Sequence, residues 1–210
     1  MAFDENKFAR YGLLAGVGFA VLAAASGVIA GSPPMVSDGD PKILEYLTDK
    51  QDTLKIASYL GGLAAVFFLW FLGSLYGRLR TAEGAAGRLS RVAMMGGVVA
   101  IAVATAANGI QASAVLRPNP GLWRVSAQFF AYTGFPIAVF AAAVSVLIWS
   151  SGLLPKWFGY AGEAIAVAFL IAAGSVATEN DTLATVGMVV FIVFAIWVVA
   201  LSVQLYRKDA

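Results

Sequence analysis

The chain has 210 residues, of which 60% are hydrophobic and only 12% are charged, and its formal net charge at pH 7 is +2. Soluble domains contain roughly 45–50% apolar and about 25% charged residues, so this composition excludes a water-soluble globule and a disordered chain and indicates an integral membrane protein. The nearly balanced charge argues against nucleic acid as a partner.

Six stretches of the sequence are long and apolar enough to cross the hydrocarbon layer, which takes about 20 residues of helix. Their apolar runs are continuous rather than alternating, which favours helices over membrane-spanning strands. We therefore predict an all-α fold, a polytopic bundle of six transmembrane helices that forms a single domain over residues 1–210. The predicted spans cover about 11–30, 56–76, 92–116, 127–149, 157–177 and 183–206.

The longest connection between two predicted spans runs from Gly31 to Lys55. Within it, Asp40 and Pro41 have the pattern of a helix N-cap followed by proline at the first helical position. Apolar residues then recur at helical spacing, with acidic residues between them. This pattern predicts a short amphipathic helix on the extracytoplasmic surface. Two interpretations stay open: a lid or docking surface at an outer cavity, or an interfacial helix that only fills space.

The connection from Gly77 to Arg91 is small, rich in glycine and alanine, and basic. Its arginines can be interpreted as contacts to anionic lipid head groups, or simply as an effect of the positive-inside rule. The candidate head-group contacts are Arg78, Arg80, Arg88 and Arg91.

The distribution of Lys and Arg predicts the orientation of the chain in the membrane. Nine of these residues lie in the two chain ends, the 77–91 connection and the 150–156 connection, and five lie in the other connections. Short loops rich in Lys and Arg stay in the cytoplasm, so we expect both termini there.

Polar side chains inside the predicted third and fourth spans form one group of candidates. Asn108 and Gln111 are three residues apart and therefore share a helix face, and Gln128 lies at a similar predicted depth in the fourth span. One hypothesis is a polar ligand pocket that opens outward. The other is amide hydrogen bonding that joins the third span to the fourth.

Glu163 is the ionisable residue that lies well inside a predicted span, six positions after Trp157. Small neighbours such as Gly159 and Gly162 predict that its helix face packs into the bundle. A carboxylate at this depth is costly unless it is paired or protonated. It is interpreted either as a proton-coupling group, cation ligand or general acid, or as the partner of a basic-connection arginine in a structural ion pair.

Glycine and proline patterns predict features of helix packing. The pairs Gly12–Gly16, Gly27–Gly31 and Gly73–Gly77 have GxxxG spacing, which we expect to serve packing inside the bundle. Pro136 in the fourth span frees a backbone carbonyl and predicts a kink.

The chain contains neither Cys nor His. Disulfides, thiolate nucleophiles, His-ligated haem and the usual zinc sites are therefore excluded, and the sequence has no phosphate-binding loop or dinucleotide fingerprint. We expect no cofactor and no metal ion.

Several short stretches resemble a known group of proteins. They are ILEYL at 43–47, YLGGL at 59–63, FLWFL at 68–72, GRLR at 77–80, and GLLPKWFG at 152–159. The chain resembles small multipass bacterial membrane proteins that are grouped as a domain of unknown function. The resemblance implies a six-helix protein of the bacterial inner membrane and implies no activity.

Three functions are consistent with these features. The leading hypothesis is a non-enzymatic membrane protein that binds a lipid or a lipophilic small molecule, or supports a complex with a membrane protein partner or a second copy. The second is a small transporter or channel that uses Glu163 and the amides of Asn108, Gln111 and Gln128. The third is an intramembrane enzyme with Glu163 as acid, which needs a second titrating group at the same depth.

Overall fold

The computed structural model describes residues 10–178 and 181–208, and within these residues it contains helices and no strand. Six helical segments are long and apolar enough to cross a membrane, which confirms the prediction of an all-α, multipass bundle. They cover Arg10–Ala30, Gln51–Glu83, Arg88–Leu116, Pro120–Ser151, Lys156–Thr178 and Asp181–Lys208.

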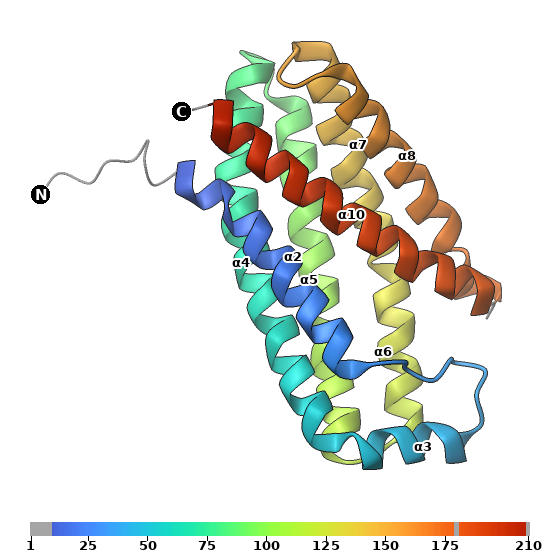
Figure 1. Ribbon diagram of the computed structural model, residues 1–210. Helices are drawn as coiled ribbons and strands as arrows, with labels where there is room; N and C mark the ends of the chain where they lie inside the picture. The colour runs from blue at the N-terminus through green and yellow to red at the C-terminus, as the bar shows by residue number, and fades with distance from the viewer. Residues whose placement is uncertain (1–9, 179–180, 209–210) are drawn as a thin grey trace, which may run out of the picture.

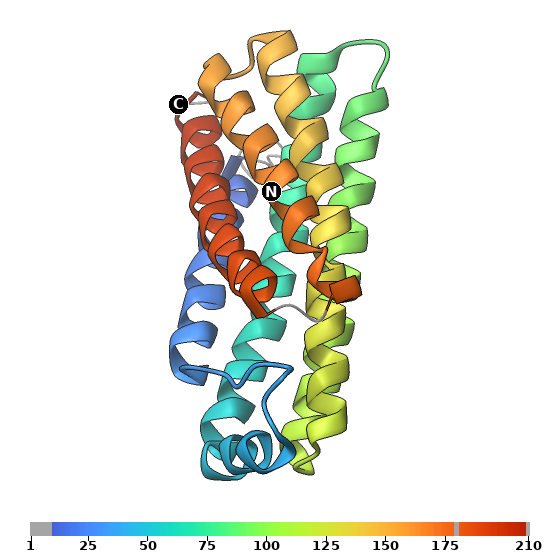
Figure 2. The same cartoon turned by 90° about the vertical axis from the view of Figure 1, so that its right-hand side faces the viewer.

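The spanning helices form a closed ring (Figures 1 and 2). Helix α2 packs on α4, α4 on α5, α5 on α6 and α7, α7 on α8, α8 on α10, and α10 returns to α2. The bounds of these helices are α2 Ala15–Ala30, α4 Gln51–Glu83, α5 Arg88–Leu116, α6 Pro120–Tyr132, α7 Gly134–Ser151, α8 Lys156–Ala172 and α10 Asp181–Lys208. Two helices are short: α3 (Asp40–Asp49) lies in a connection, and α9 (Ser175–Thr178) ends the fifth spanning segment.

The bundle has two distinct ends (Figure 1). One end carries the beginning of the described chain, its end, and the connections 84–87 and 152–155; we call it the termini end. The opposite end carries α3, and we call it the α3 end. The four segments that were predicted to share one side of the membrane therefore lie together.

The fourth span is interrupted near its middle, as Pro136 predicted. Helix α6 ends at Tyr132 and α7 begins at Gly134, so the break falls at Thr133, three residues before the proline. Proline has no N–H to donate, so the carbonyl one turn earlier loses its helical partner. The physical cause of the break is this missing donor.

Helix α3 confirms the predicted amphipathic helix, with Pro41 in its first turn. Its buried side chains, Ile43 and Leu47, pack in a small cluster with Trp123 of α6. The prediction of Asp40 as the N-cap was wrong, because Gly39 occupies that position and no side chain caps the helix. Asp40 is the first helical residue, and its carboxylate accepts a hydrogen bond from Arg124 at 2.6 Å.

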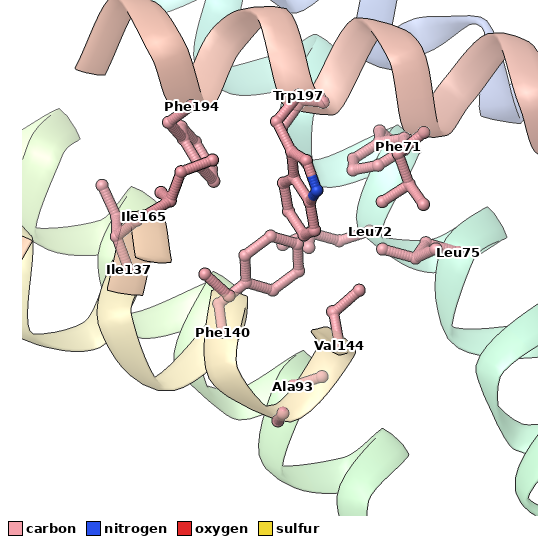
Figure 3. Packing of buried hydrophobic residues seen from close by; sticks show 14 of the residues in the cluster. Phe71, Leu72, Leu75, Ala93, Ile137, Phe140, Val144, Ile165, Phe194 and Trp197 are labelled. Atoms are coloured by element: carbon pink, nitrogen blue, oxygen red, sulfur yellow. The ribbon is translucent and has the colours of Figure 1, made fainter. Parts of the chain in front are cut away.

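Aromatic side chains fill the centre of the ring (Figure 3). Phe140 of α7 makes edge contacts with Phe194 and Trp197 of α10, at ring-centroid distances of 6.1 and 6.4 Å. Phe68 of α4 contacts both Phe140 and Phe194, at ring-centroid distances of 5.9 and 6.3 Å. Each of these four side chains is at most 4% exposed. The middle of the bundle is therefore a packed apolar core.

The GxxxG prediction is right for one pair and wrong for others. A Cβ at Gly16 would overlap the Phe71 ring, at 2.9 Å, so this glycine serves close packing inside the bundle. A Cβ at Gly73 or Gly77 would meet nothing within 4 Å, and both residues are exposed on α4. Residue spacing alone does not say which face of a helix a pair occupies.

Candidate functional site

Asn108 joins α5 to α4. Its half-buried amide donates a hydrogen bond from Nδ2 to the backbone carbonyl of Ser58 at 2.8 Å. Gly61 leaves the space for this side chain, because a Cβ there would lie 3.2 Å from Asn108 Oδ1. The amide therefore bonds to the second span, and not to the fourth span as one interpretation of the sequence expected.

A groove lies beside this hydrogen bond on the surface of the bundle. It has a volume of about 300 Å³ and runs between α4 and α5 near the α3 end. Its lining residues are Lys55, Ser58 and Tyr59 on α4, and Asn108, Gly109, Ala112 and Leu116 on α5. One of the three amide residues predicted to form a pocket, Asn108, thus borders a cavity.

The groove is polar at one end and apolar along its floor. Lys55 stands at the outer end and pairs with Asp52 at 2.9 Å, with 42% of the lysine side chain still exposed. Tyr59 follows one turn later and is 69% exposed. Gly109 and Ala112 form a low floor, and a Cβ at Gly109 would meet nothing within 4 Å. This arrangement fits a long apolar molecule with a polar head.

Lys55, Ser58 and Tyr59 were not predicted as site residues. The signal was present, because a lysine and an aromatic residue one turn apart at the start of an apolar run are typical of a membrane interface. What the sequence did not contain was the pairing of α4 with α5, which places these side chains opposite Gly109.

Gln111 and Gln128 do not join Asn108 in one site. Both side chains are half-buried, and neither lines the α4–α5 groove. Within residues 10–178 and 181–208, no hydrogen bond links either amide to Asn108. The predicted cluster of three amides is therefore not assembled.

Glu163 has an indole as its partner. Its Oε1 accepts a hydrogen bond from Nε1 of Trp149 at 2.7 Å, which links α8 to α7. The three ion pairs formed between described residues all lie near the α3 end, and none includes Glu163. The expected ion pair with an arginine was therefore wrong. Trp149 is 37% exposed, so the pair lies at the edge of the α7–α8 seam.

The small-residue face predicted around Glu163 exists and packs on α7. A Cβ at Gly159 would lie 2.8 Å from the backbone oxygen of Ser145, and one at Gly162 would lie 2.7 Å from the Trp197 ring. Glycine at both positions lets α8 approach α7 and α10 closely. Glu163 lies beside this contact between α8 and α7.

The candidate groups lie at opposite ends of the bundle. Asn108 is eight residues from the end of α5 at the α3 end, whereas Glu163 is seven residues from the start of α8 at the termini end. The aromatic core around Phe140 separates the two ends. A transport pathway through the axis would have to pass through these buried rings.

The four arginines of the basic connection differ in their surroundings. Arg80 donates to the backbone carbonyls of Gly84 and Ala85 and so closes the turn after α4. Arg88 and Arg91 are exposed at the beginning of α5, and Arg78 is half-buried on α4. Arg80 thus serves the turn, and contact with lipid head groups stays a prediction for Arg78, Arg88 and Arg91.

Glu83 stabilises the same turn, between α4 and α5, through its carboxylate. Its two carboxylate oxygens accept hydrogen bonds from the backbone N–H groups of Leu89 and Ser90, at 2.7 and 2.8 Å. These are free donors of the first turn of α5, which a carboxylate satisfies well. Gly87, with φ of +56°, supplies the left-handed residue that the turn needs just before α5.

At the α3 end, Arg124 of α6 holds the 31–39 segment in place. Its guanidinium donates to the backbone carbonyls of Val36 and Asp38, at 3.1 and 2.9 Å, and to the carboxylate of Asp40. Tyr46 of α3 also donates to the carbonyl of Ala30 at 3.0 Å, and burial raises the pKa of Tyr46 to about 12. We call residues 31–39 the strap. The strap and α3 together form a fixed cap on this end.

No family model matches the chain, and neither do the curated proteins or the solved structures searched. Among the described residues, no three acidic side chains gather closely enough to hold a metal ion. The chemistry of the molecule therefore has to be inferred from its own geometry.

Proposed function

We propose that this chain is a non-enzymatic integral membrane protein that binds a lipid or another lipophilic molecule in the α4–α5 groove. The observation that carries the proposal is the groove itself, with its polar outer end at Lys55 and its low floor at Gly109 and Ala112. Ligand sites in proteins are usually concave and largely apolar, with a few polar groups that fix orientation.

The physical basis of binding is close packing. Between apolar groups in a membrane there is little hydrophobic driving force, so association depends on van der Waals contact and on hydrogen bonds. A floor made of a glycine and an alanine lets an acyl chain or a ring approach the helix backbone closely. Lys55 and Tyr59 then provide a cation and a hydroxyl at the depth of the head groups.

We also propose that the termini end faces the cytoplasm of a bacterial inner membrane. The support is the excess of Lys and Arg in the segments of that end, nine against five elsewhere. In this orientation the groove opens into the outer leaflet, and α3 lies on the extracytoplasmic surface.

The two other functions that the sequence left open have weaker support. A transporter would need a polar route between Glu163 and Asn108, and buried aromatic rings occupy the axis between them. An intramembrane enzyme would need a second titrating group beside Glu163. The hydrogen-bond partner of Glu163 is instead the indole of Trp149, which does not titrate.

The proposal is tested with a phospholipid that carries a diazirine in its acyl chain, mixed into nanodiscs that hold the purified protein. Light should cross-link this probe to the peptide around residues 105–116. Gly109→Leu should reduce this cross-linking several-fold, because leucine fills the groove floor while its Cβ enters open space. The matched control is Gly73→Leu, where a Cβ is equally free but no groove is lined.

Equal cross-linking of residues 105–116 in the unchanged chain and in Gly109→Leu would overturn the groove as the binding site. Lys55→Gln adds a separate test of the polar end, because it removes the cation without filling the floor. It should weaken the preference for anionic over zwitterionic probes and leave total cross-linking nearly unchanged.

A further inference from the structure

A second cavity, of about 480 Å³, lies at the termini end, away from the α4–α5 groove. One wall is the α7–α8 connection, residues 152–155. The other wall is the last two turns of α10, with Gln204, Arg207 and Lys208. Its volume is within the range, roughly 300–1,000 Å³, that proteins use for small ligands.

The α7–α8 wall is held in a defined shape by its own sequence. Gly152, with φ of +68°, ends α7 in the left-handed conformation. The hydroxyl of Ser151 accepts a hydrogen bond from the N–H of Leu153 at 3.2 Å. Leu154 is only 7% exposed and anchors the connection in the core, and Pro155 precedes α8. The hollow is therefore formed by the fold and does not need a ligand to shape it.

The charged residues known to line this cavity are basic. Arg207 and Lys208 are both exposed, and no acidic residue of the described ranges 10–178 and 181–208 lines the cavity. Lys208 donates from Nζ to the carbonyl of Leu153 at 2.8 Å, which ties α10 to the connection. The guanidinium of Arg207 forms no hydrogen bond with any residue in the described part of the chain. A planar guanidinium beside an ammonium group is suited to bind the oxygens of a phosphate.

The depth of the cavity matches that of lipid phosphates. Trp157, in the first turn of α8, is 61% exposed, and Tyr206 lies in the last turn of α10. Exposed Trp and Tyr side chains at both ends of apolar helices mark the level of the head groups. Leu153 and Leu154 line the same cavity and supply apolar contact for the glycerol part of a lipid.

From these observations we infer that the cavity between the α7–α8 connection and the end of α10 binds the phosphate of an anionic phospholipid. The inference does not depend on the groove proposed above, which lies at the other end of the bundle and has other lining residues. It differs also from general attraction to the basic connection, because it assigns a formed site with Arg207 in its lining.

The test measures binding of short-chain phosphatidylglycerol to the detergent-purified full chain by native mass spectrometry, with phosphatidylcholine for comparison. Arg207→Gln should weaken phosphatidylglycerol binding about tenfold, the effect of losing one charge-assisted hydrogen bond. The matched control is Arg117→Gln, which removes the same charge from an exposed arginine that does not line the cavity. It should change binding less than about twofold, because an exposed charge in micelles is well screened.

Three results would overturn the inference. Binding by Arg207→Gln that equals that of the unchanged chain would exclude Arg207 from the site. An equal loss in Arg117→Gln would show a general charge effect. If inorganic phosphate alone protects the chain against heat as well as phosphatidylglycerol does, the ligand is soluble phosphate and not a lipid. Arg207→Lys separates folding from binding, since it keeps the charge and should retain part of the affinity.

Discussion

At the scale of single residues, two polar groups inside the spans, Asn108 and Glu163, have local partners. Asn108 donates to the carbonyl of Ser58, and Glu163 accepts from the indole of Trp149. An unpaired polar group in hydrocarbon costs several kcal/mol, so each such group is expected to find the nearest donor or acceptor. The sequence indicated which residues needed a partner. It did not indicate which partner they have, because an indole and a backbone carbonyl carry no charge that would identify them as the complement of a polar side chain.

The Glu163–Trp149 hydrogen bond predicts a specific order of stabilities. Glu163→Gln keeps an oxygen that accepts from the indole, so its melting temperature in detergent should stay close to that of the unchanged chain. Trp149→Phe removes the donor and should destabilise the fold by about 1–2 kcal/mol. Thermal unfolding by circular dichroism near neutral pH measures both. If Glu163→Gln proved to be the more destabilised of the two, the carboxylate charge would be needed and a cation would be its partner.

Asp38 in the strap predicts a dependence of stability on pH. Hydrogen bonds from Lys42 and from the Met35 amide, at 2.8 and 2.7 Å, hold the pKa of Asp38 below its usual 3.8, against the opposing effect of burial. Because the folded-state pKa is the lower one, this stabilisation is complete above the usual value and disappears as the pH falls through the folded-state pKa. The difference in melting temperature between the unchanged chain and Asp38→Asn should therefore shrink between about pH 6 and about pH 3. A difference that stays constant over this range would contradict the assignment.

At the scale of elements, the cap at the α3 end explains how a long connection becomes ordered. Ile43 and Leu47 of α3 are fully buried against the ends of the spans, and Arg124 holds the strap. The amphipathic pattern predicted α3, but not its neighbours. The partners of Arg124 are mainly backbone carbonyls, and any residue type at 36 or 38 would supply these.

Arg124→Gln should release the strap while α3 keeps its buried face. Hydrogen–deuterium exchange should become faster at residues 33–39 and stay unchanged in α4 and α5. Arg117→Gln is the control, because Arg117 is an exposed arginine in the next connection at the same end. If strap exchange were equal in both variants, the guanidinium would not be what holds it.

The helices are longer than the predicted spans, and the reason lies in how helix ends are formed. Helix α4 begins at Gln51 and ends at Glu83, several residues beyond the predicted apolar stretch at both ends. Its first and last turns are polar, and they continue the helix outside the hydrocarbon. Hydropathy detects the part of a helix that lies in lipid, whereas helix ends are set by caps and turns such as those at Gly84 and Lys50.

At the scale of the whole molecule, the composition was enough to predict the class and the number of spans, because a continuous apolar run of about 20 residues is typical of a membrane-spanning helix. The order of helices around the ring was not predictable. Every span is apolar on most faces, and its residue pattern does not indicate which other span it packs against. The α4–α5 groove depends on that order, and therefore appeared only in the structure.

The orientation of the whole bundle can be tested with single cysteines, because the chain has none of its own. Thr48→Cys lies on the exposed side of α3, and Ala86→Cys lies in the basic turn at the termini end. A membrane-impermeant maleimide added to spheroplasts should label Thr48→Cys, and should label Ala86→Cys only after the membrane is permeabilised. The reverse pattern would place the termini outside.

The central claim is that ligands bind on the surface of this bundle and that its axis is closed. Val144 tests this claim most directly, since its side chain is fully buried beside Phe140 in the aromatic core (Figure 3). In proteoliposomes, Val144→Cys should resist a small water-soluble thiol reagent added to both sides, while Ala86→Cys reacts rapidly. Rapid reaction of Val144→Cys in a folded protein would mean that water reaches the axis, and the transporter hypothesis would replace the account given above.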